Sequence, residues 1–576
     1  MVADPDEWPS WGRTGHETHF SPLDDIDTDN VADLKLAWHF DLEPGYSSST
    51  PLMADGKVFI TTGHSHIRAL DAVTGTQIWE YDGGTRERAT SSFQLGWGNK
   101  GIAYSEGRVF LATTDGYVVA LDARTGKEAW KVRDVPDDGV PRQYNAPTRV
   151  FGGKVIVGFG GADVSPARGF VTAYDAKTGK LAWRFFTTPG DEVSPANRKA
   201  EEVMRKTWPT GWKNSNGSRR GGGTMWNAFA FDPGLNLLYL GVGNGFPYNQ
   251  DLRSPGGGDN LFLASVVAID ANTGEYKWHY QTCPAEQWDC TATADMTLAT
   301  LEIDGKPRKV LMQAPKNGFF YVLDRKTGEF ISAEKIAKVT WAEKIDPKTG
   351  RPVENPGIRY NGKPGLFEMW PGPTGAHSWM PQAYSPKTGL VYVPVQELGA
   401  LIGEGQKGGG ELAAGMGVTL IPEVDLPGGH KSYLKAWNPV TQTEAWRVET
   451  PGTWPGGVMA SAGNLVFQGQ MDGQFIARDA ETGKELWSFK TESPIVGAPI
   501  TYRVNGRQYV TVITGAGGQG SGMQTLGNRA FRTDYRLPRR VLTFALDGKD
   551  TVPPFAVPTR SPADDPDYKA DAARTQ

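Results

Sequence analysis

Short stretches in which apolar and polar residues alternate recur along the chain and predict β-strands. KVFITTG, RVFLATTDGYVVAL and NLVFQGQMDGQFIA are examples. Side chains alternate between the two faces of a strand, so this pattern is typical of strands that bury one face. The pattern therefore predicts a chain built mainly from strands.

A longer repeat, A-x-D-x-x-T-G-x-x-x-W, lies on top of this alternation. Each copy predicts a strand ending at Asp, a tight turn in which T-G supplies the positive φ, and a return strand carrying an inward Trp. Close copies end at Trp79, Trp130, Trp183, Trp278 and Trp487. Degenerate copies lie around Asp324, at Trp446 and around Asp547, which brings the total to eight.

Eight four-stranded sheets cannot each bury both faces alone, so radial packing into an eight-bladed β-propeller is predicted, an all-β fold. The last copy, at Asp547, lacks a following Trp, whereas LKLAWHF near the N-terminus carries Trp38 without a preceding turn. We therefore expect this N-terminal strand to close the last blade.

Residues 1–576 are predicted to form a single propeller domain. The uneven spacing of the repeats predicts long insertions at about 186–222 and 335–378, and a C-terminal tail at about 551–576. Loops of that length on a rigid scaffold commonly carry function.

Charge and composition narrow the classes of partner. The chain has Lys+Arg 60 and Asp+Glu 65, which gives a net charge of −5, and it shows no basic stripe. This charge pattern disfavours nucleic acid as the partner and favours a small molecule or a protein. No apolar run has the length of a membrane span, and the start MVADPDEWPSWGR lacks a signal-peptide pattern. The chain is then cytoplasmic or the mature form of an exported protein, and its few thiols favour export.

The two cysteines of the chain, Cys283 and Cys290, lie seven positions apart. If the protein is exported, a disulfide across this loop is the favoured interpretation. A zinc site is disfavoured because two cysteines alone do not complete a set of zinc ligands. No C-x-x-C-H occurs, so we expect no cytochrome c domain in this chain and an external electron carrier.

Several motifs occur together with the eight repeats. They are GGGTMW (221–226), GVGNGFPYNQDLRSPGGGDN (241–260), EQWD (286–289) and QAPKNGFFYVLDRKTGE (313–329). In this order they resemble the quinoprotein alcohol dehydrogenases, which bind pyrroloquinoline quinone (PQQ) and a metal ion. The resemblance covers essentially residues 7–550.

The resemblance implies functions for particular residues. Asp163 and Asn244 match metal ligands, and Asp289 matches the catalytic base, which is also a candidate metal ligand. Oxygen ligands of this kind suit Ca²⁺. Trp226 matches the indole on which the quinone lies, and Thr224 matches a hydroxyl at its edge. The other implied cofactor-binding positions are Lys316, Lys100, Gly161, Ala162, Ser378 and Trp454.

The sequence also departs from the family pattern. Gln94 and Leu95 replace adjacent cysteines over the quinone, and Ser49 replaces a Glu. The ligand Asp163 is shorter than the usual Glu, while Lys100 and Ser378 replace Arg and Asn. Lanthanide-using members carry an Asp two positions after the catalytic one, and here that position is Thr291, so calcium is expected rather than a lanthanide.

Two features lead us to expect a larger primary or secondary alcohol, such as a polycyclic natural product or toxin. They are the changed residues over the quinone and the Trp-, Pro- and Gly-rich segment 366–382. The expected acceptor is an external carrier such as a soluble cytochrome c, and the expected location is the periplasm.

Each candidate residue also has an ordinary structural interpretation. An Asp after Trp is commonly a solvated turn, an Asn among glycines forms turns, and Lys316 precedes an NG turn. The competing class is a non-enzymatic envelope propeller scaffold, which would have no reason to hold these residues at their motif positions. A hydrolase is disfavoured because we find no nucleophile elbow.

Overall fold

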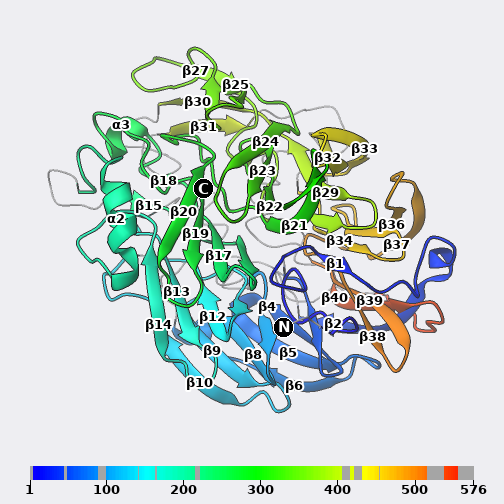
Figure 1. The fold of residues 1–576 in the computed structure, drawn as a ribbon. Coiled ribbons are helices and arrows are strands. Elements are labelled where there is room, and N and C mark those ends of the chain that lie inside the picture. The colour runs from blue at the N-terminus through cyan, green and yellow to red at the C-terminus, as the bar shows by residue number, and fades with distance from the viewer. Residues whose placement is uncertain are drawn as a thin grey trace.

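The structure is a computed structural model. It describes residues 4–43, 49–88, 99–140, 142–161, 165–213, 221–404, 416–420, 431–452, 454–515 and 538–554. Within these ranges, eight sheets of four or five strands follow one another around the molecule in chain order (Figure 1). This arrangement confirms the predicted eight-bladed β-propeller.

In the first four blades, each strand pairs antiparallel with the next one along the chain within its blade. Blade 1 contains β3 (Leu52–Ala54), β4 (Lys57–Thr62), β5 (His66–Asp71) and β6 (Gln77–Tyr81). Blade 2 contains β7 (Ala103–Ser105), β8 (Arg108–Ala112), β9 (Tyr117–Asp122) and β10 (Glu128–Arg133). Blade 3 contains β11 (Arg149–Phe151), β12 (Lys154–Val157), β13 (Phe170–Asp175) and β14 (Leu181–Phe186). Blade 4 contains β16 (Phe229–Asp232), β17 (Leu237–Gly241), β19 (Ser265–Asp270) and β20 (Tyr276–Gln281).

The remaining blades repeat this order, with additions from the N-terminal region in the last two. Blade 5 contains β21 (Met296–Ile303), β22 (Lys306–Gln313), β23 (Phe319–Asp324) and β24 (Phe330–Lys335). Blade 6 contains β28 (Ala383–Ser385), β29 (Leu390–Glu397), β32 (Lys431–Asn438) and β33 (Thr443–Thr450). Blade 7 contains β34 (Val458–Ser461), β35 (Leu465–Gly469), β36 (Gln474–Asp479), β37 (Glu485–Lys490) and the parallel strand β1 (Phe20–Ser21). Blade 8 contains β38 (Ile500–Val504), β39 (Arg507–Ile513), β40 (Arg539–Ala545) and β2 (Lys35–Leu42).

The ring closes as the sequence predicts. β2 pairs antiparallel with β40 from Lys35 opposite Ala545 to Leu42 opposite Arg539, and Figure 1 shows the blue β2 beside the orange and red strands of blade 8. The first and last parts of the chain therefore share one sheet.

The Trp of each close repeat joins its blade to the next one. Trp79, on the outermost strand of blade 1, donates its indole N–H to the Ala123 carbonyl of blade 2 at 3.0 Å. Its ring lies over Gly126, where a Cβ would come within 2.8 Å of the indole. The Trp side chain, which the repeat predicts to point inward, therefore faces the neighbouring blade. The same indole-to-carbonyl contact joins Trp38 to Ala72, Trp130 to Ala176, Trp183 to Ala271 and Trp446 to Ala480.

The segment before β1 contacts all eight blades. Its residues hydrogen-bond to the first strand of each sheet, so these first strands must converge around it on the propeller axis. The contacts join Trp8 to Met53, Pro9 to Tyr104, Glu17 to Arg149, Gly15 to Phe231, His16 to Leu298, Thr18 to Tyr384, His19 to Ala460 and Asp6 to Arg503. We call residues 6–21 the axial segment.

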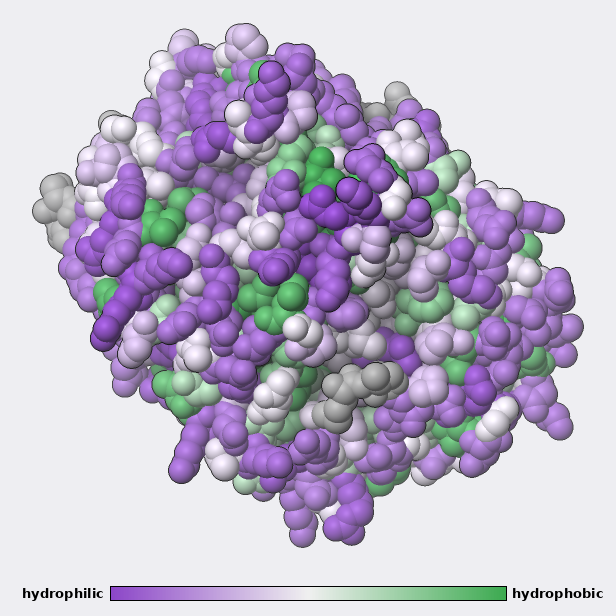
Figure 2. Space-filling model, viewed as in Figure 1, coloured by the Kyte–Doolittle hydropathy of each residue, from purple (hydrophilic) through white to green (hydrophobic). Residues whose placement is uncertain are grey.

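Other elements lie outside the blades. They are η1 (Val31–Asp33), η2 (Gly63–Ser65), α1 (Thr85–Arg88), η4 (Pro195–Asn197), α2 (Arg198–Arg205), β15 (Gly221–Gly222), β18 (Gly245–Phe246), α3 (Gln250–Arg253), β25 (Ala342–Ile345), β26 (Pro352–Glu354), β27 (Leu366–Met369), β30 (Ala400–Glu404) and β31 (Met416–Leu420). Among the described residues, no helix combines the length and the apolar character needed to cross a bilayer. Figure 2 shows a mostly hydrophilic face with small, separate hydrophobic patches.

Candidate active site

Two glycine-rich segments lie side by side at the start of the site. β15 (Gly221–Gly222) pairs antiparallel with β18 (Gly245–Phe246). Next to this pair, the carbonyl of Asn244 accepts a backbone N–H of the facing segment at 2.8 Å, and that of Thr224 accepts another at 3.0 Å. Gly222 has a φ of 104°, and a Cβ there would overlap the Asn244 carbonyl. Glycine therefore permits the close approach that brings Thr224 beside Asn244.

Both of these residues hold a buried oxygen that has no hydrogen-bond partner among the described residues. These atoms are Oδ1 of Asn244 and Oγ1 of Thr224, and each side chain is about 1% exposed. The Asn244 amide nitrogen, by contrast, donates to the Gly245 carbonyl at 3.2 Å. Leaving a buried acceptor unmatched costs about 1–3 kcal/mol, so such an atom is commonly satisfied by a ligand or an ordered water.

Asp289 ends the EQWD motif in a left-handed backbone conformation, with a φ of 62°. This conformation is uncommon for a residue other than glycine, and such residues cluster at functional sites. Its Oδ2 accepts a hydrogen bond from Lys316 Nζ at 2.9 Å, and both side chains are mostly buried. Lys316 is in turn packed against Gly375, where a Cβ would overlap the lysine chain. Both side chains are thus largely shielded from solvent. The structural interpretation of Asp289 and Lys316 as surface residues is therefore wrong.

A disulfide joins Cys283 to Cys290. This confirms the predicted pairing, and it closes the loop that presents Asp289. Inside the loop, the carboxylate of Glu286 accepts the backbone N–H of Cys290 at 3.2 Å. The segment around the candidate base is thus fixed by a covalent bond at its ends and a buried hydrogen bond within it.

Trp226 lies in a second part of the site, formed by aromatic side chains. It packs against a buried cluster that includes Trp379 and Trp454. Lys100 Nζ lies 5.1 Å from the centroid of the Trp226 ring and 5.6 Å from that of Trp379. This ammonium also lies 3.4 Å from the carbonyl oxygens of Asn145 and Trp226. The arrangement provides a flat indole surface with a cation beside it.

Burial lowers the pKa of Lys100 to about 7, while the charge of Asp295 acts in the opposite direction. The cause is desolvation, since the ammonium is surrounded by indole rings and carbonyl groups. A lysine in this position changes its charge near neutral pH.

The other predicted positions are distributed as follows. Ser378 is buried next to Trp379, and Gly161, with a φ of 112°, accepts a hydrogen bond from Ser165 at 2.9 Å. Gly160, its neighbour, lies against Trp226. Four of the positions lie outside the described residues, namely Ala162, Asp163, Gln94 and Leu95. Their assignments stay predictions.

A buried carboxylate that the motifs did not indicate is hydrogen-bonded to the residue that follows Trp226. Asp295 accepts hydrogen bonds from Asn227 Nδ2 at 2.9 Å and from Trp11 Nε1 at 2.8 Å. A third partner of Asp295 is His19, whose Nε2 lies 3.2 Å from Oδ2. Burial opposes ionisation, but the His19 hydrogen bond, the charges of His19 and Arg149 and the Trp11 hydrogen bond together outweigh it and lower the Asp295 pKa. Only the position of Asn227, directly after the GGGTMW motif, could have hinted at this network.

The site offers oxygen donors to a cation. No group of three or more His, Cys, Asp or Glu side chains converges on a metal position within the described ranges, which leave out Asp163. The donors present are the Asp289 carboxylate and the Asn244 amide oxygen, which suit a hard cation such as Ca²⁺. The unmatched Thr224 hydroxyl and the Trp226 face suit a flat, polar-edged cofactor. The residues therefore fit both groups.

Comparison with known proteins identifies the class. Residues 8–343 and 427–510 match the family model "PQQ: Glucose/ethanol/alcohol dehydrogenase, beta-propeller domain". The chain is 47% identical over 555 residues to the quinohemoprotein alcohol dehydrogenase ADH IIB of Pseudomonas putida, covering 96% of this chain and 79% of that one. It is 40% identical over 571 residues to 1-butanol dehydrogenase (cytochrome c) of Thauera butanivorans, covering 95% and 79%.

A solved structure agrees with this result. The quinohemoprotein alcohol dehydrogenase ADHIIG of Pseudomonas putida HK5 superposes with a TM-score of 0.89 at 42% identity, covering 97% of this chain and 82% of that one. The fold and the comparisons define a PQQ-binding propeller oxidoreductase. The chain belongs to the family of PQQ-dependent alcohol dehydrogenases, and it is an enzyme that oxidises alcohols. The scaffold alternative is not favoured.

Proposed function

We propose that this enzyme oxidises a larger primary or secondary alcohol to an aldehyde or ketone, with Asp289 as the base that takes the hydroxyl proton. The observation that carries the proposal is the pair of unmatched buried oxygens on Asn244 and Thr224, in a site that also contains the Asp289–Lys316 pair. A ligand that satisfies these oxygens would remove their desolvation cost.

The bound groups would be held by separate residues. Asn244, Asp289 and Asp163 would bind Ca²⁺, while Thr224, Trp226, Lys316, Lys100, Gly161, Ala162, Ser378 and Trp454 would hold PQQ. When bound, the quinone supplies a carbon that accepts hydride from the alcohol, and the cation supplies Lewis-acid polarisation. Thr291, two positions after Asp289, supports calcium over a lanthanide, since it carries no carboxylate.

The chain's own residues account for the proton. Lys316 donates to Oδ2 of Asp289 and so fixes the orientation of the carboxylate. A nearby cation keeps a mostly buried Asp ionised and able to accept a proton. With PQQ bound, the alcohol hydroxyl would give its proton to Asp289, and PQQ would supply the acceptor for the hydride and its two electrons.

We propose an external carrier for these electrons, such as a soluble cytochrome c. The support is that one relative is a 1-butanol dehydrogenase (cytochrome c). We also propose a periplasmic location, which the Cys283–Cys290 disulfide supports because disulfides persist in oxidising compartments.

The experiment is a titration of purified protein with PQQ, with and without Ca²⁺ or a lanthanide, followed by dye reduction with small and bulky alcohols. We expect turnover to need PQQ and Ca²⁺, and to favour bulky alcohols. Asp289→Asn keeps the shape but cannot accept the proton, so kcat should fall about 10²–10⁴-fold while the protein stays folded. Absence of PQQ binding under every metal would contradict the proposal, and a preference for short alcohols would contradict its substrate part.

A further inference from the structure

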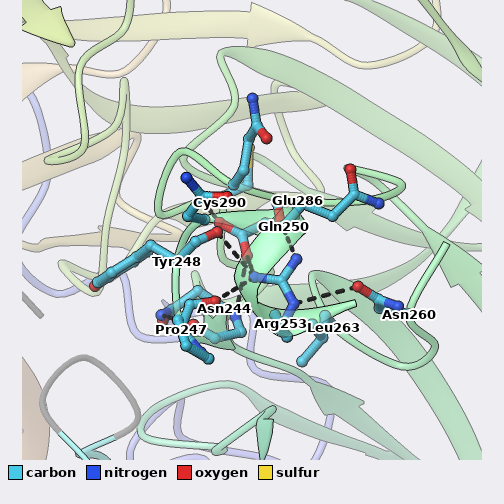
Figure 3. A network of polar contacts seen from close by, with 12 residues as sticks. Asn244, Pro247, Tyr248, Gln250, Arg253, Asn260, Leu263, Glu286 and Cys290 are labelled. Atoms are coloured by element: carbon cyan, nitrogen blue, oxygen red, sulfur yellow. Dashed lines mark hydrogen bonds and ion pairs between the residues drawn. The ribbon is translucent and has the colours of Figure 1, made fainter. Parts of the chain in front are cut away.

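Glu286 is a fully buried carboxylate with backbone donors on both oxygens. Oε2 accepts the N–H of Gly245 at 3.0 Å, and Oε1 accepts that of Cys290 at 3.2 Å. The N–H of Asp289 is a further donor to this carboxylate. Gly245 directly follows Asn244, so Glu286 spans the gap between the segment of the candidate metal ligand and the segment of the candidate base (Figure 3).

Arg253, at the end of α3, supplies the opposite charge. Its Nη1 lies 3.9 Å from Glu286 Oε2, and neither side chain is exposed. The guanidinium also donates to the carbonyl oxygens of Pro247 at 2.6 Å and Tyr248 at 2.9 Å, and to Asn260 Oδ1 at 3.2 Å. A further N–H donates to the Glu286 carbonyl. Figure 3 shows Arg253 in the middle of these partners.

We propose that Glu286 is a positioning residue, which holds Asn244 and Asp289 in one rigid arrangement, with Arg253 as its fixed counter-charge. The proposal rests on the proposed function, because Asn244 and Asp289 have their roles only there. Glu286 itself need not touch substrate or cofactor, since its carboxylate oxygens are occupied by backbone N–H groups.

The chemistry of the position requires a carboxylate. An ionised carboxylate accepts hydrogen bonds on two oxygens, whereas a glutamine accepts on one and donates from its nitrogen. In Glu286→Gln, the amide nitrogen would therefore face the N–H of either Gly245 or Cys290. The segment that carries this N–H would lose its hydrogen bond to residue 286, while the size of the side chain stays the same.

The matched control is Asp232 in blade 4. Its carboxylate also accepts two backbone N–H groups, from Gly234 at 2.8 Å and Leu235 at 3.0 Å, and pairs with the buried Arg325 at 2.7 Å. Asp232→Asn thus removes a buried, arginine-paired charge that contacts neither Asn244 nor Asp289.

The test uses the full chain and two independent readouts. Hydrogen–deuterium exchange should rise in Glu286→Gln for the peptides that contain Gly245 and Cys290. The Ca²⁺ concentration for half-maximal reconstitution with PQQ should rise about 10–100-fold, as is typical when a residue behind a metal ligand is lost. We expect kcat to fall by a similar factor, with KM for the alcohol changing less, and Asp232→Asn to match the wild type in each of these quantities.

Arg253→Lys provides a second variant in case Glu286→Gln does not fold. It keeps the charge but loses the fork that contacts Pro247, Tyr248 and Asn260, so it should raise exchange at Gly245 and weaken Ca²⁺ binding in the same direction. Wild-type exchange and Ca²⁺ dependence in the Glu286 variant, or equal losses in the Asp232 control, would overturn the proposal. Failure of the wild type to bind PQQ or Ca²⁺ would instead overturn the proposed function, and the exchange data would still decide whether Glu286 couples the segments.

Discussion

Lys100 lies near two indole rings, no carboxylate of the described residues contacts its ammonium, and this environment makes its charge sensitive to pH. Water would stabilise the ammonium better than indole faces and carbonyl groups do, so its pKa is lowered to about 7. Below this pH the side chain is a cation beside Trp226, and above it the side chain is a neutral amine.

This gives a prediction for cofactor affinity. PQQ carries carboxylates, so a protonated Lys100 attracts it, and binding should weaken as the pH rises through about 7. Lys100→Arg stays charged throughout this range and should flatten the dependence. The measurement is a PQQ titration followed by quenching of tryptophan fluorescence between pH 6 and 9. Equal slopes in the two proteins would show that Lys100 does not control the affinity.

At the scale of elements, the contact between a Trp and the glycine turn of the next blade joins neighbouring sheets. Gly126 needs to be glycine for two reasons. Its φ is 71°, and a Cβ would lie 2.8 Å from Trp79. Gly107 in the same blade has a φ of 74° but nothing within 4 Å of its Cβ position.

Alanine substitutions at Gly107 and Gly126 separate two costs in the free energy of unfolding. One is backbone strain, and the other is steric overlap between blades. Gly107→Ala should cost only the strain of a left-handed alanine, about 1 kcal/mol. Gly126→Ala should cost that strain plus about 1–3 kcal/mol for displacing the indole. Urea unfolding of both variants, compared at constant m-value, would measure the difference. Equal losses would mean that the Trp79 contact contributes little.

At the scale of the whole molecule, the axial segment, residues 6–21, acts on all blades together. Within it, Glu17 forms a fully buried pair with Arg149, with Oε1 2.8 Å from Nε. Removing one partner of such a pair leaves the other buried without compensation.

Glu17→Ala should therefore destabilise the protein by about 3–5 kcal/mol and lower the midpoint of the whole unfolding transition. The control is Asp25→Ala, which breaks a partly exposed pair with Arg503 at 3.0 Å and should cost no more than about 1 kcal/mol. Calorimetry of both variants is the measurement. A separate early transition in Glu17→Ala would show that the segment detaches without affecting the ring.

Much of this architecture could be predicted because it depends on local spacing. Each Asp-turn-Trp unit is specified within a few positions, and the missing Trp after Asp547 identified Trp38 as the closing residue. The axial segment could not be predicted, since its partners in the eight blades lie far from it in the sequence and it carries no repeat. Likewise, Glu286 lay inside a recognised motif, but its carboxylate binds Gly245, which is distant in sequence.

The axial segment also bears on the order in which the protein can be made. It leaves the ribosome before any of the blades, yet its hydrogen-bond partners extend to Ala460 and Arg503, and β2 must wait for β40. The axial segment is therefore already present while the first blades of a nascent chain form. It cannot complete its contacts until the later blades have been made. Long-range closure of this kind makes folding slow. The site around Trp226, which packs against the cluster that includes Trp11 of that segment, should become competent only after blade 8 has been synthesised.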